Sequence, residues 1–274
     1  EVQYVATNVG HGNPRVYYNI VPKDDRSDYA ELFVQLEEHT SPKRKLAIID
    51  QLRKQWTPYP GAKVEVKNFE QGPPVIAPVE VRLYGENLDT LSVLAAQVEK
   101  LLRTVDGTLY VNNPLMHRKS DIKVAINKEK AIQLGVPTLS MDRSIRMAVA
   151  GLEMGTFTDA AGDEFSIVVS KPKEARPGLE VFDDLYVNAA NGTAIPLKQI
   201  AGLTFESSPL SINHFNKART VSVSAYVQKG YLNDEVINGV IAKMDQVKLP
   251  SGYSYEMGGE VESRNESFGG FGTI

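Results

Sequence analysis

The sequence predicts an α+β protein made of split βαβ units, with a hairpin-rich unit inserted between two of them. Three observations indicate this fold. A strand-like run, an amphipathic helix, a turn and a second strand-like run follow one another three times along the chain. Between the second and third copies the pattern changes to short helices and hairpins. Residues 72–78 are rich in proline, which cannot donate to a sheet ladder, so this segment is expected to link the first copy to the second.

The first copy follows a strand-like run at residues 2–5, and its first strand is predicted at residues 15–21. Ser41 and Pro42 are a favourable N-cap and first helical residue, which predicts a helix over residues 42–56. A turn containing Gly61 then leads to a second predicted strand at residues 62–68. The helix has one apolar face, formed by Leu46, Ile49, Leu52 and Trp56.

The second and third copies are more regular than the first, and their helices are expected to begin after the caps Asn87 and Asn233. The apolar stripe of each helix needs a sheet face to cover it, and one copy alone supplies too little sheet. Strands from both copies are therefore predicted to share one sheet in the split βαβ, or ferredoxin-like, arrangement. The second copy comprises strands at 79–84 and 108–111 with a helix at 88–105, and the third comprises strands at 220–227 and 253–257 with a helix at 234–247.

The inserted unit is expected over residues 121–206. It begins with an alternating strand at 121–127, which is followed by short helices at 129–134 and 140–150. Two hairpins come next, and Asn-Gly at the second bend is the strongest short-range hairpin signal. The residues at the two predicted tips are Asp159, Gly162, Asn191 and Gly192.

Composition describes an ordinary globular chain of 274 residues, with 42% hydrophobic and 23% charged residues. A net charge of −4 argues against a nucleic-acid partner, because phosphate binding needs a concentrated basic face. The absence of cysteine excludes disulfides and thiolate-bound metals. No run approaches the roughly 18–20 apolar residues that span a bilayer. The chain begins directly before a strand-like apolar run and ends within an apolar, glycine-rich segment, so it is expected to be part of a longer protein.

Residues that could carry chemistry are scattered. The four histidines have no metal-ligand spacing, and the acidic cluster at residues 24–28 lacks the glycine and terminal glutamate of a calcium loop. We therefore expect no enzyme, no catalytic residue, no metal site and no cofactor. A hydrolase on this scaffold would need an arginine and a polar partner converging on an anion, and an RNA-binding sheet would need exposed aromatic side chains and a basic face.

Three phrases carry a family resemblance. They are DIKVAINKEKAIQLGV at residues 121–136, LYVNAANGTAIPL at 185–197 and LPSGYSYEMGGE at 249–260. In this order they resemble the second large periplasmic loop of resistance-nodulation-division (RND) multidrug efflux transporters of the acriflavine-resistance type.

The resemblance implies a domain plan. Residues 1–72 correspond to the first C-terminal porter subdomain, without the strand and helix that open it in the family. Residues 77–120 with 207–261 correspond to the second porter subdomain, and residues 121–206 to the docking subdomain. The tail at residues 262–274 would lead to a membrane helix of the full protein.

The resemblance also implies a function and partners. The whole protein would be a homotrimeric, proton-driven antiporter of the bacterial inner membrane, whose proton-carrying acids lie in membrane segments absent from this chain. Its periplasmic face would pass amphiphilic drugs or other small molecules towards an outer-membrane channel, with the help of a periplasmic adaptor protein. The alternative is a small-molecule-binding or assembly module of a different RND-type exporter, for lipids or metals.

By resemblance, the substrate cleft lies between the two porter subdomains, beside a mobile loop in which glycine permits large backbone excursions. Phe69 is expected to point into this cleft. The cleft residues are Glu65, Lys67, Phe69, Asn112 and Ser224, and the loop residues are Asn8, Gly10, His11, Gly12 and Asn13.

Overall fold

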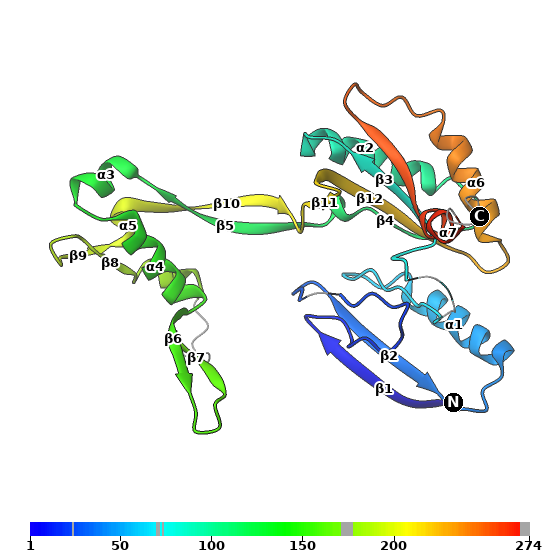
Figure 1. Ribbon diagram of the computed structural model, residues 1–274, viewed down its shortest axis with the longest axis horizontal. Helices are drawn as coiled ribbons and strands as arrows, with labels where there is room; N and C mark the ends of the chain where they lie inside the picture. The colour runs from blue at the N-terminus through cyan, green and yellow to red at the C-terminus, as the bar shows by residue number, and fades with distance from the viewer. Residues whose placement is uncertain (24, 70–71, 73, 171–177, 269–274) are drawn as a thin grey trace. The chain divides into compact units, whose positions relative to one another are not determined.

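A computed structural model describes residues 1–23, 25–69, 72, 74–170 and 178–268 (Figure 1). The chain divides into two compact units. Unit 1 comprises Glu1–Arg118 and Pro209–Ile274, and unit 2 comprises Lys119–Ser208. Both contain helices together with small antiparallel sheets, so the predicted α+β class is confirmed.

Unit 1 contains a five-stranded sheet in the order β11–β12–β3–β13, with β4 also paired to β12. All of these pairings are antiparallel. Val223 of β12 lies opposite Val81 of β3, which confirms that strands from the second and third copies share one sheet. The strands are β3 (Val79–Tyr84), β4 (Thr108–Asn112), β11 (Asn213–Phe215), β12 (Ala218–Val227) and β13 (Ser254–Gly259).

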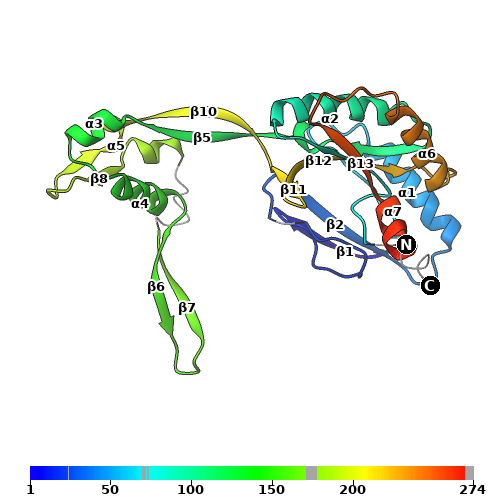
Figure 2. The same ribbon diagram turned by 45° about the horizontal axis from the view of Figure 1, so that its top comes forward.

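Two helices, α2 (Leu88–Leu102) and α6 (Asn233–Met244), cover one face of this sheet (Figure 2). Both end slightly before their predicted last residues. Asn87 caps α2 as predicted, but Asn233 does not cap α6 and instead donates its side-chain amide to Glu260. The buried core between helices and sheet includes Val79, Val81, Leu83, Leu91, Leu94, Val98, Leu102, Val221, Val223, Val236, Val240 and Met244.

The opposite face of the sheet carries a buried charge, Arg82, whose side chain is only 8% exposed. Its guanidinium donates to both carboxylate oxygens of Glu262, at 3.1 and 2.9 Å, and lies 3.8 Å from the centre of the Phe215 ring. Glu262 belongs to α7 (Glu260–Phe268), which follows β13. Gly259 makes the turn between them at φ +66°, where a Cβ would lie 2.7 Å from two carbonyl oxygens. Arg82 therefore ties β3, α7 and β11 together.

The first copy folds differently from the prediction. β1 (Val2–Val9) pairs antiparallel with β2 (Ala30–Leu36), and α1 (Pro42–Trp56) has the predicted bounds. The strands predicted at residues 15–21 and 62–68 are wrong, because both segments are irregular. Residues 15–21 form a turn in which the Ile20 amide donates to the Tyr17 carbonyl. Strand-like composition indicates only that a segment suits a pleated surface, and it finds a ladder only where a partner lies beside it.

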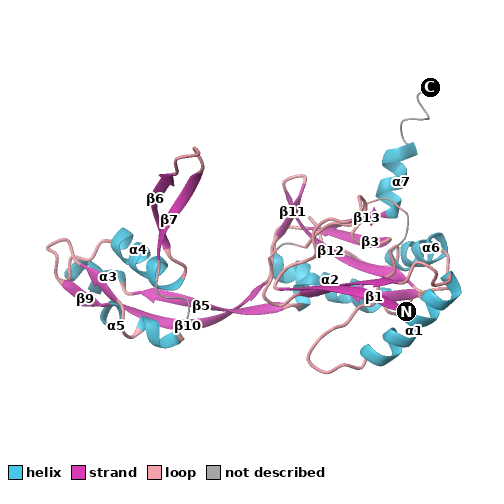
Figure 3. Cartoon of the chain, turned by 90° about the horizontal axis from the view of Figure 1, so that it is seen from below, coloured by secondary structure: helices cyan, strands magenta, loops and turns pink. Residues whose placement is uncertain are grey.

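Unit 2 is built on a pair of long strands, β5 (Arg118–Ile126) and β10 (Ala201–Pro209) (Figure 3). The strand at β5, the two short helices and both hairpins are confirmed, whereas β10 and the short helix before it were not predicted. Between β5 and β10 lie α3 (Lys128–Gln133), α4 (Thr138–Val149), β6 (Leu152–Thr158), β7 (Glu164–Val169), β8 (Tyr186–Asn188), β9 (Ala194–Pro196) and α5 (Leu197–Ile200). Its core includes Val136, Met141, Leu185, Val187, Leu197 and Ile200.

The remaining short elements are two 3-10 turns, η1 (Pro114–Met116) and η2 (Leu179–Phe182). The described residues of the proline-rich linker form neither helix nor strand, as predicted. Within the described part of the chain, no helix has both the length and the apolar character needed to cross a membrane.

Candidate functional site

A group of paired charges in unit 1 contains two of the residues predicted for the cleft. Glu65 accepts from the ammonium groups of Lys63 at 2.8 Å and Lys67 at 2.9 Å. Partial burial alone would raise the pKa of Glu65, but the two lysines outweigh it and the net pKa is lowered. The Lys67 ammonium also lies 4.3 Å from the centre of the Tyr226 ring, a cation–π distance. Both oxygens of Glu65 are therefore occupied by cations of the same chain.

The two residues predicted for the opposite wall lie side by side. Asn112 on β4 is the register partner of Ser224 on β12, and Ser224 is buried. Lys63 reaches the same strand, because its ammonium donates to the carbonyl of Val111 at 3.1 Å. Lys63 thus contacts β4 next to Asn112, and Lys67 contacts Tyr226 on the same strand as Ser224.

Phe69 lies in an aromatic cluster with residues of the first copy. Its ring centre is 5.2 Å from that of Tyr17 and 5.4 Å from that of Phe33. Phe33 in turn contacts Tyr4 at 6.3 Å. Phe69 remains 42% exposed, so its expected role at a cleft stays a prediction.

The glycine-containing loop begins inside β1, because Asn8 is a strand residue that lies opposite Glu31. Backbone hydrogen bonds hold the rest of the loop: Gly10 donates to Tyr29 at 2.8 Å and Gly12 to Lys23 at 3.2 Å. The side-chain amide of Asn8 also donates to the side-chain oxygen of Asn13, and the backbone amide of Asn13 donates to the carboxylate of Glu31. His11 is exposed, and its Nδ1 lies 2.7 Å from the carbonyl of Gly12. The mobility of this loop stays a prediction.

Electrostatic coupling connects the loop region to the paired charges. The pKa of Lys23 is lowered by partial desolvation and by the charges of Lys67 and Arg26. The pKa of Tyr29 is raised by burial and by the charge of Glu31. Neither residue was predicted, because both lie outside regular sequence patterns.

Two further residues were missed, and a sequence signal exists for one of them. Tyr110 precedes Asn112 by two positions, and Tyr226 follows Ser224 by two. Alternate residues of a regular strand share a face, so Ser224 points to Tyr226, whereas the register shift in β4 between Leu109 and Asn112 removes this signal for Tyr110. Their rings lie 6.5 Å apart in an edge-on arrangement.

The predicted hairpin tips of unit 2 are exposed turns. Asp159 accepts from the backbone amides of Ala161 at 2.8 Å and Asp163 at 3.0 Å, and Gly162 has φ +92°. In the second hairpin, Asn191 accepts from the amide of Thr193 at 3.0 Å, next to Gly192 at φ +84°. The side-chain oxygens of Asp159 and Asn191 thus already accept hydrogen bonds from backbone amides of their own turns.

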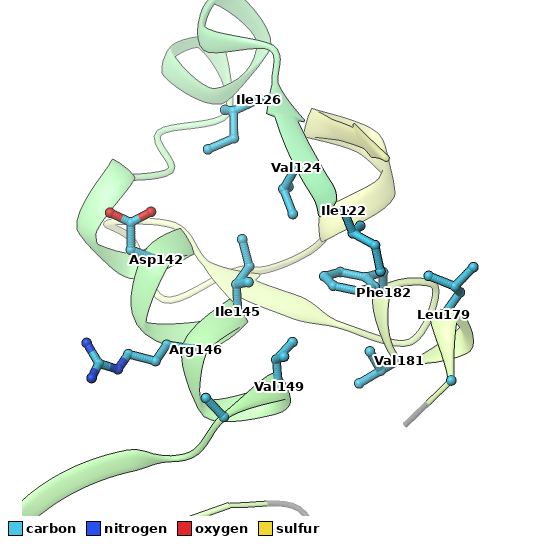
Figure 4. A pocket seen from close by; sticks show the side chains of 12 residues that line it. Ile122, Val124, Ile126, Asp142, Ile145, Arg146, Val149, Leu179, Val181 and Phe182 are labelled. Carbon is cyan, nitrogen blue, oxygen red and sulfur yellow. The ribbon is translucent and has the colours of Figure 1, made fainter. Parts of the chain in front are cut away.

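A cavity of about 720 Å³ also lies in unit 2 (Figure 4). Apolar side chains from β5, α4 and η2 form most of its wall, with Asp142 and Arg146 on α4. The residues predicted for the cleft do not line it. In the described part of the chain, no cluster of three or more His, Cys, Asp or Glu side chains is arranged to hold a metal ion.

Comparison with known proteins decides the family. The model of the AcrB/AcrD/AcrF family matches residues 3–273. The chain belongs to this family. The RND resemblance predicted from the three phrases is therefore confirmed.

Curated relatives of the family include metal-resistance proteins. The cobalt-zinc-cadmium resistance protein CzcA of Cupriavidus metallidurans is 30% identical over 190 residues, which are 67% of this chain and 18% of that protein. The nickel and cobalt resistance protein CnrA of the same organism is 26% identical over 275 residues, or 96% of this chain and 25% of that protein. The chain thus spans a quarter or less of the length of these two relatives.

A solved structure shares the fold. The X-ray crystal structure of a heavy metal efflux pump matches with a TM-score of 0.76 at 18% identity, over 97% of this chain and 28% of that one. At this identity the likeness shows the fold alone.

Proposed function

We propose that this chain is the periplasmic, substrate-handling portion of an RND efflux transporter of the inner membrane. In this proposal residues 1–72 and residues 77–120 with 207–261 are the porter subdomains, and residues 121–206 are the docking subdomain. The family match over nearly the whole chain is the observation that carries the proposal. Residues 262–274 would lead into the membrane part, where proton-driven antiport would take place.

The docking subdomain would meet a periplasmic adaptor protein and an outer-membrane channel, and the whole transporter would be a homotrimer. The exposed tips at Asp159–Gly162 and Asn191-Gly192 support this part of the proposal, since their closing side chains are already satisfied within each turn. A contact at these tips would therefore use the turn as a preformed shape.

The cargo we propose is an amphiphilic organic molecule, bound where Glu65 and Lys67 face the sheet surface with Asn112 and Ser224. The tyrosine rings at 110 and 226 support this cargo, because aromatic rings offer large apolar area. Glu65 is neutralised by two lysines at 2.8 and 2.9 Å, so it does not present a free carboxylate to a metal ion.

A transition-metal cation is the second candidate cargo. The names of the relatives favour it, since CzcA and CnrA are named for resistance to cobalt, zinc, cadmium and nickel. A metal carried by this chain would require ligands other than the paired carboxylate of Glu65.

One experiment distinguishes the organic cargo from the metal cargo. The full-length transporter is expressed in a host that lacks its own pumps, and resistance is measured against a panel of organic dyes and detergents and against salts of the four metals. We expect resistance to organic compounds, and we expect Lys67→Ala to change the pattern within that panel while Lys54→Ala, on the exposed side of α1, does not. Resistance to metals alone would refute the organic cargo, and resistance to neither class would refute both.

A further inference from the structure

Tyr110 has an unusual backbone conformation in the middle of β4. Asn112 lies opposite Ser224, but Leu109 lies opposite Tyr226, so Tyr110 and Val111 together face the single residue Ala225. This is a β-bulge, and its first residue has φ +53°. Glycine is the usual residue at such a position, and asparagine is tolerated, whereas a bulky side chain is strained there. The sequence nevertheless places a tyrosine at the bulge.

The bulge supplies two contacts that a regular strand would not. It turns the Tyr110 hydroxyl towards residues 63–67, where it accepts from the backbone amide of Val66 at 3.0 Å. It also leaves the carbonyl of Val111 free to accept from the Lys63 ammonium at 3.1 Å. Arg53 completes the contact, since its Nε donates to the Val66 carbonyl at 3.0 Å and its guanidinium lies 5.7 Å from the Tyr110 ring centre.

These contacts provide hydrogen-bond partners for the backbone amide and carbonyl of Val66. Residues 62–68 form no ladder with another strand, and Val66 is partly buried. A buried amide without a partner is costly, so its donor needs an acceptor from somewhere else. The Tyr110 hydroxyl and the Arg53 side chain take the places that a neighbouring strand would occupy. Strain at Tyr110 is thus coupled to the placement of Glu65 and Lys67, the residues on either side of Val66.

We propose that the bulge at Tyr110 is a clasp: it positions residues 63–67 against the surface of β4 and β12, and so sets where Glu65 and Lys67 lie relative to Asn112 and Ser224. Tyr110 is in this view a positioning residue. Only the transport consequence of the clasp rests on the proposed function, because the contacts can be tested on this chain without any cargo.

The first test is hydrogen exchange of the Val66 amide, followed by NMR. Tyr110→Phe removes the acceptor and keeps the ring, so protection of this amide should fall by about 2- to 12-fold, as loss of one hydrogen bond predicts. Tyr186→Phe, an exposed tyrosine on β8 in unit 2, is the matched control and should leave Val66 unchanged. Unchanged protection in Tyr110→Phe would overturn the clasp.

A second variant separates the clasp from the stability of the sheet. Tyr110→Asn keeps a residue that tolerates positive φ and removes both ring and hydroxyl. We expect the melting temperature to stay level or rise while the Val66 amide loses protection. If the amides of β12 near Tyr226 lose protection instead, the tyrosine serves the sheet itself and the clasp is wrong.

Transport supplies the third readout. In the full-length transporter, Tyr110→Phe should alter resistance to those compounds that Lys67→Ala also affects, with expression unchanged. A loosened Val66 together with an unchanged resistance profile would leave the clasp standing and overturn the assignment of this surface to cargo. The two failures are therefore distinguishable.

Discussion

Replacing Glu262 with glutamine should destabilise unit 1 through Arg82. The Arg82 side chain is 8% exposed and that of Glu262 is 25% exposed, so their two hydrogen bonds lie in a poorly solvated place. Hydrogen bonds to charged groups contribute about 1.5–3 kcal/mol each, and breaking a buried pair costs about 3–5 kcal/mol. Arg82 keeps Glu80 at 3.3 Å and the Phe215 ring, and glutamine can still accept one hydrogen bond. We therefore expect a loss of about 2 kcal/mol.

The loss should depend on pH in a defined direction. The hydrogen bond from Arg82 lowers the pKa of Glu262 below its ordinary value of 4.5. A carboxyl with a lowered folded-state pKa contributes its full stability above the unfolded value, and that contribution disappears as pH falls through the folded value. The difference between the native chain and Glu262→Gln should thus be constant from about pH 6 to 8 and shrink below about pH 4.5.

Urea unfolding followed by circular dichroism measures this difference, and thermal unfolding should show a shift of about 4–8 °C for a unit of this size. Asp234→Asn is the matched control, because it breaks another pair to the same helix, Arg264–Asp234, in which both side chains are about half-exposed. Exposed pairs contribute about 0–1 kcal/mol. If both variants lose the same small amount at pH 7, the assigned role of Arg82 is refuted.

Two further predictions concern the core and a hairpin tip. Leu91→Ala, at a fully buried position of α2, should cost about 2–5 kcal/mol in urea unfolding, whereas Val93→Ala on the exposed face of the same helix should stay within about 0.5 kcal/mol. A similar cost for both would contradict the assigned helix face. Asp159→Ala removes the acceptor of two turn amides, so the amides of β6 and β7 should exchange faster while the circular dichroism spectrum stays native. Unchanged exchange would show that the turn does not depend on this carboxylate.

The regular parts of the fold follow from the sequence because their signals are local. Asn87 caps α2 and accepts from Thr90, and the apolar stripe that begins at Leu91 points to the sheet. The pairing of β3 with β12 follows from the need to cover two such stripes, although the strands are far apart in sequence. The strand predicted at residues 15–21 is wrong for the opposite reason, since strand-like composition does not show whether a neighbouring strand is present to pair with it.

The candidate site divides in the same way. Asn112 and Ser224 could be assigned to one wall through the family resemblance, and they lie opposite each other on β4 and β12. Tyr110 could not, since positive φ at a tyrosine contradicts its local preference and is tolerated only where tertiary contacts compensate. Lys23 lies in an irregular segment, and its closeness to Lys67 depends on folding contacts that no spacing records.

The pairing of β5 with β10 has a consequence for how this chain could be modified. Asp121 near the start of β5 contacts Ser208 near the end of β10, and Lys123 contacts Glu206, so the two paired strands run in opposite directions. The chain therefore leaves unit 1 and returns to it at nearly the same point, with the order of the five-stranded sheet uninterrupted. Replacing residues 119–208 by a short turn would leave both connections of unit 1 closable. Alternatively, with β5 and β10 retained, a different hairpin-bearing module could be grafted between these two strands. Unit 2 is in this sense an exchangeable cassette, whose length and contacts can change without re-registering the sheet that receives it.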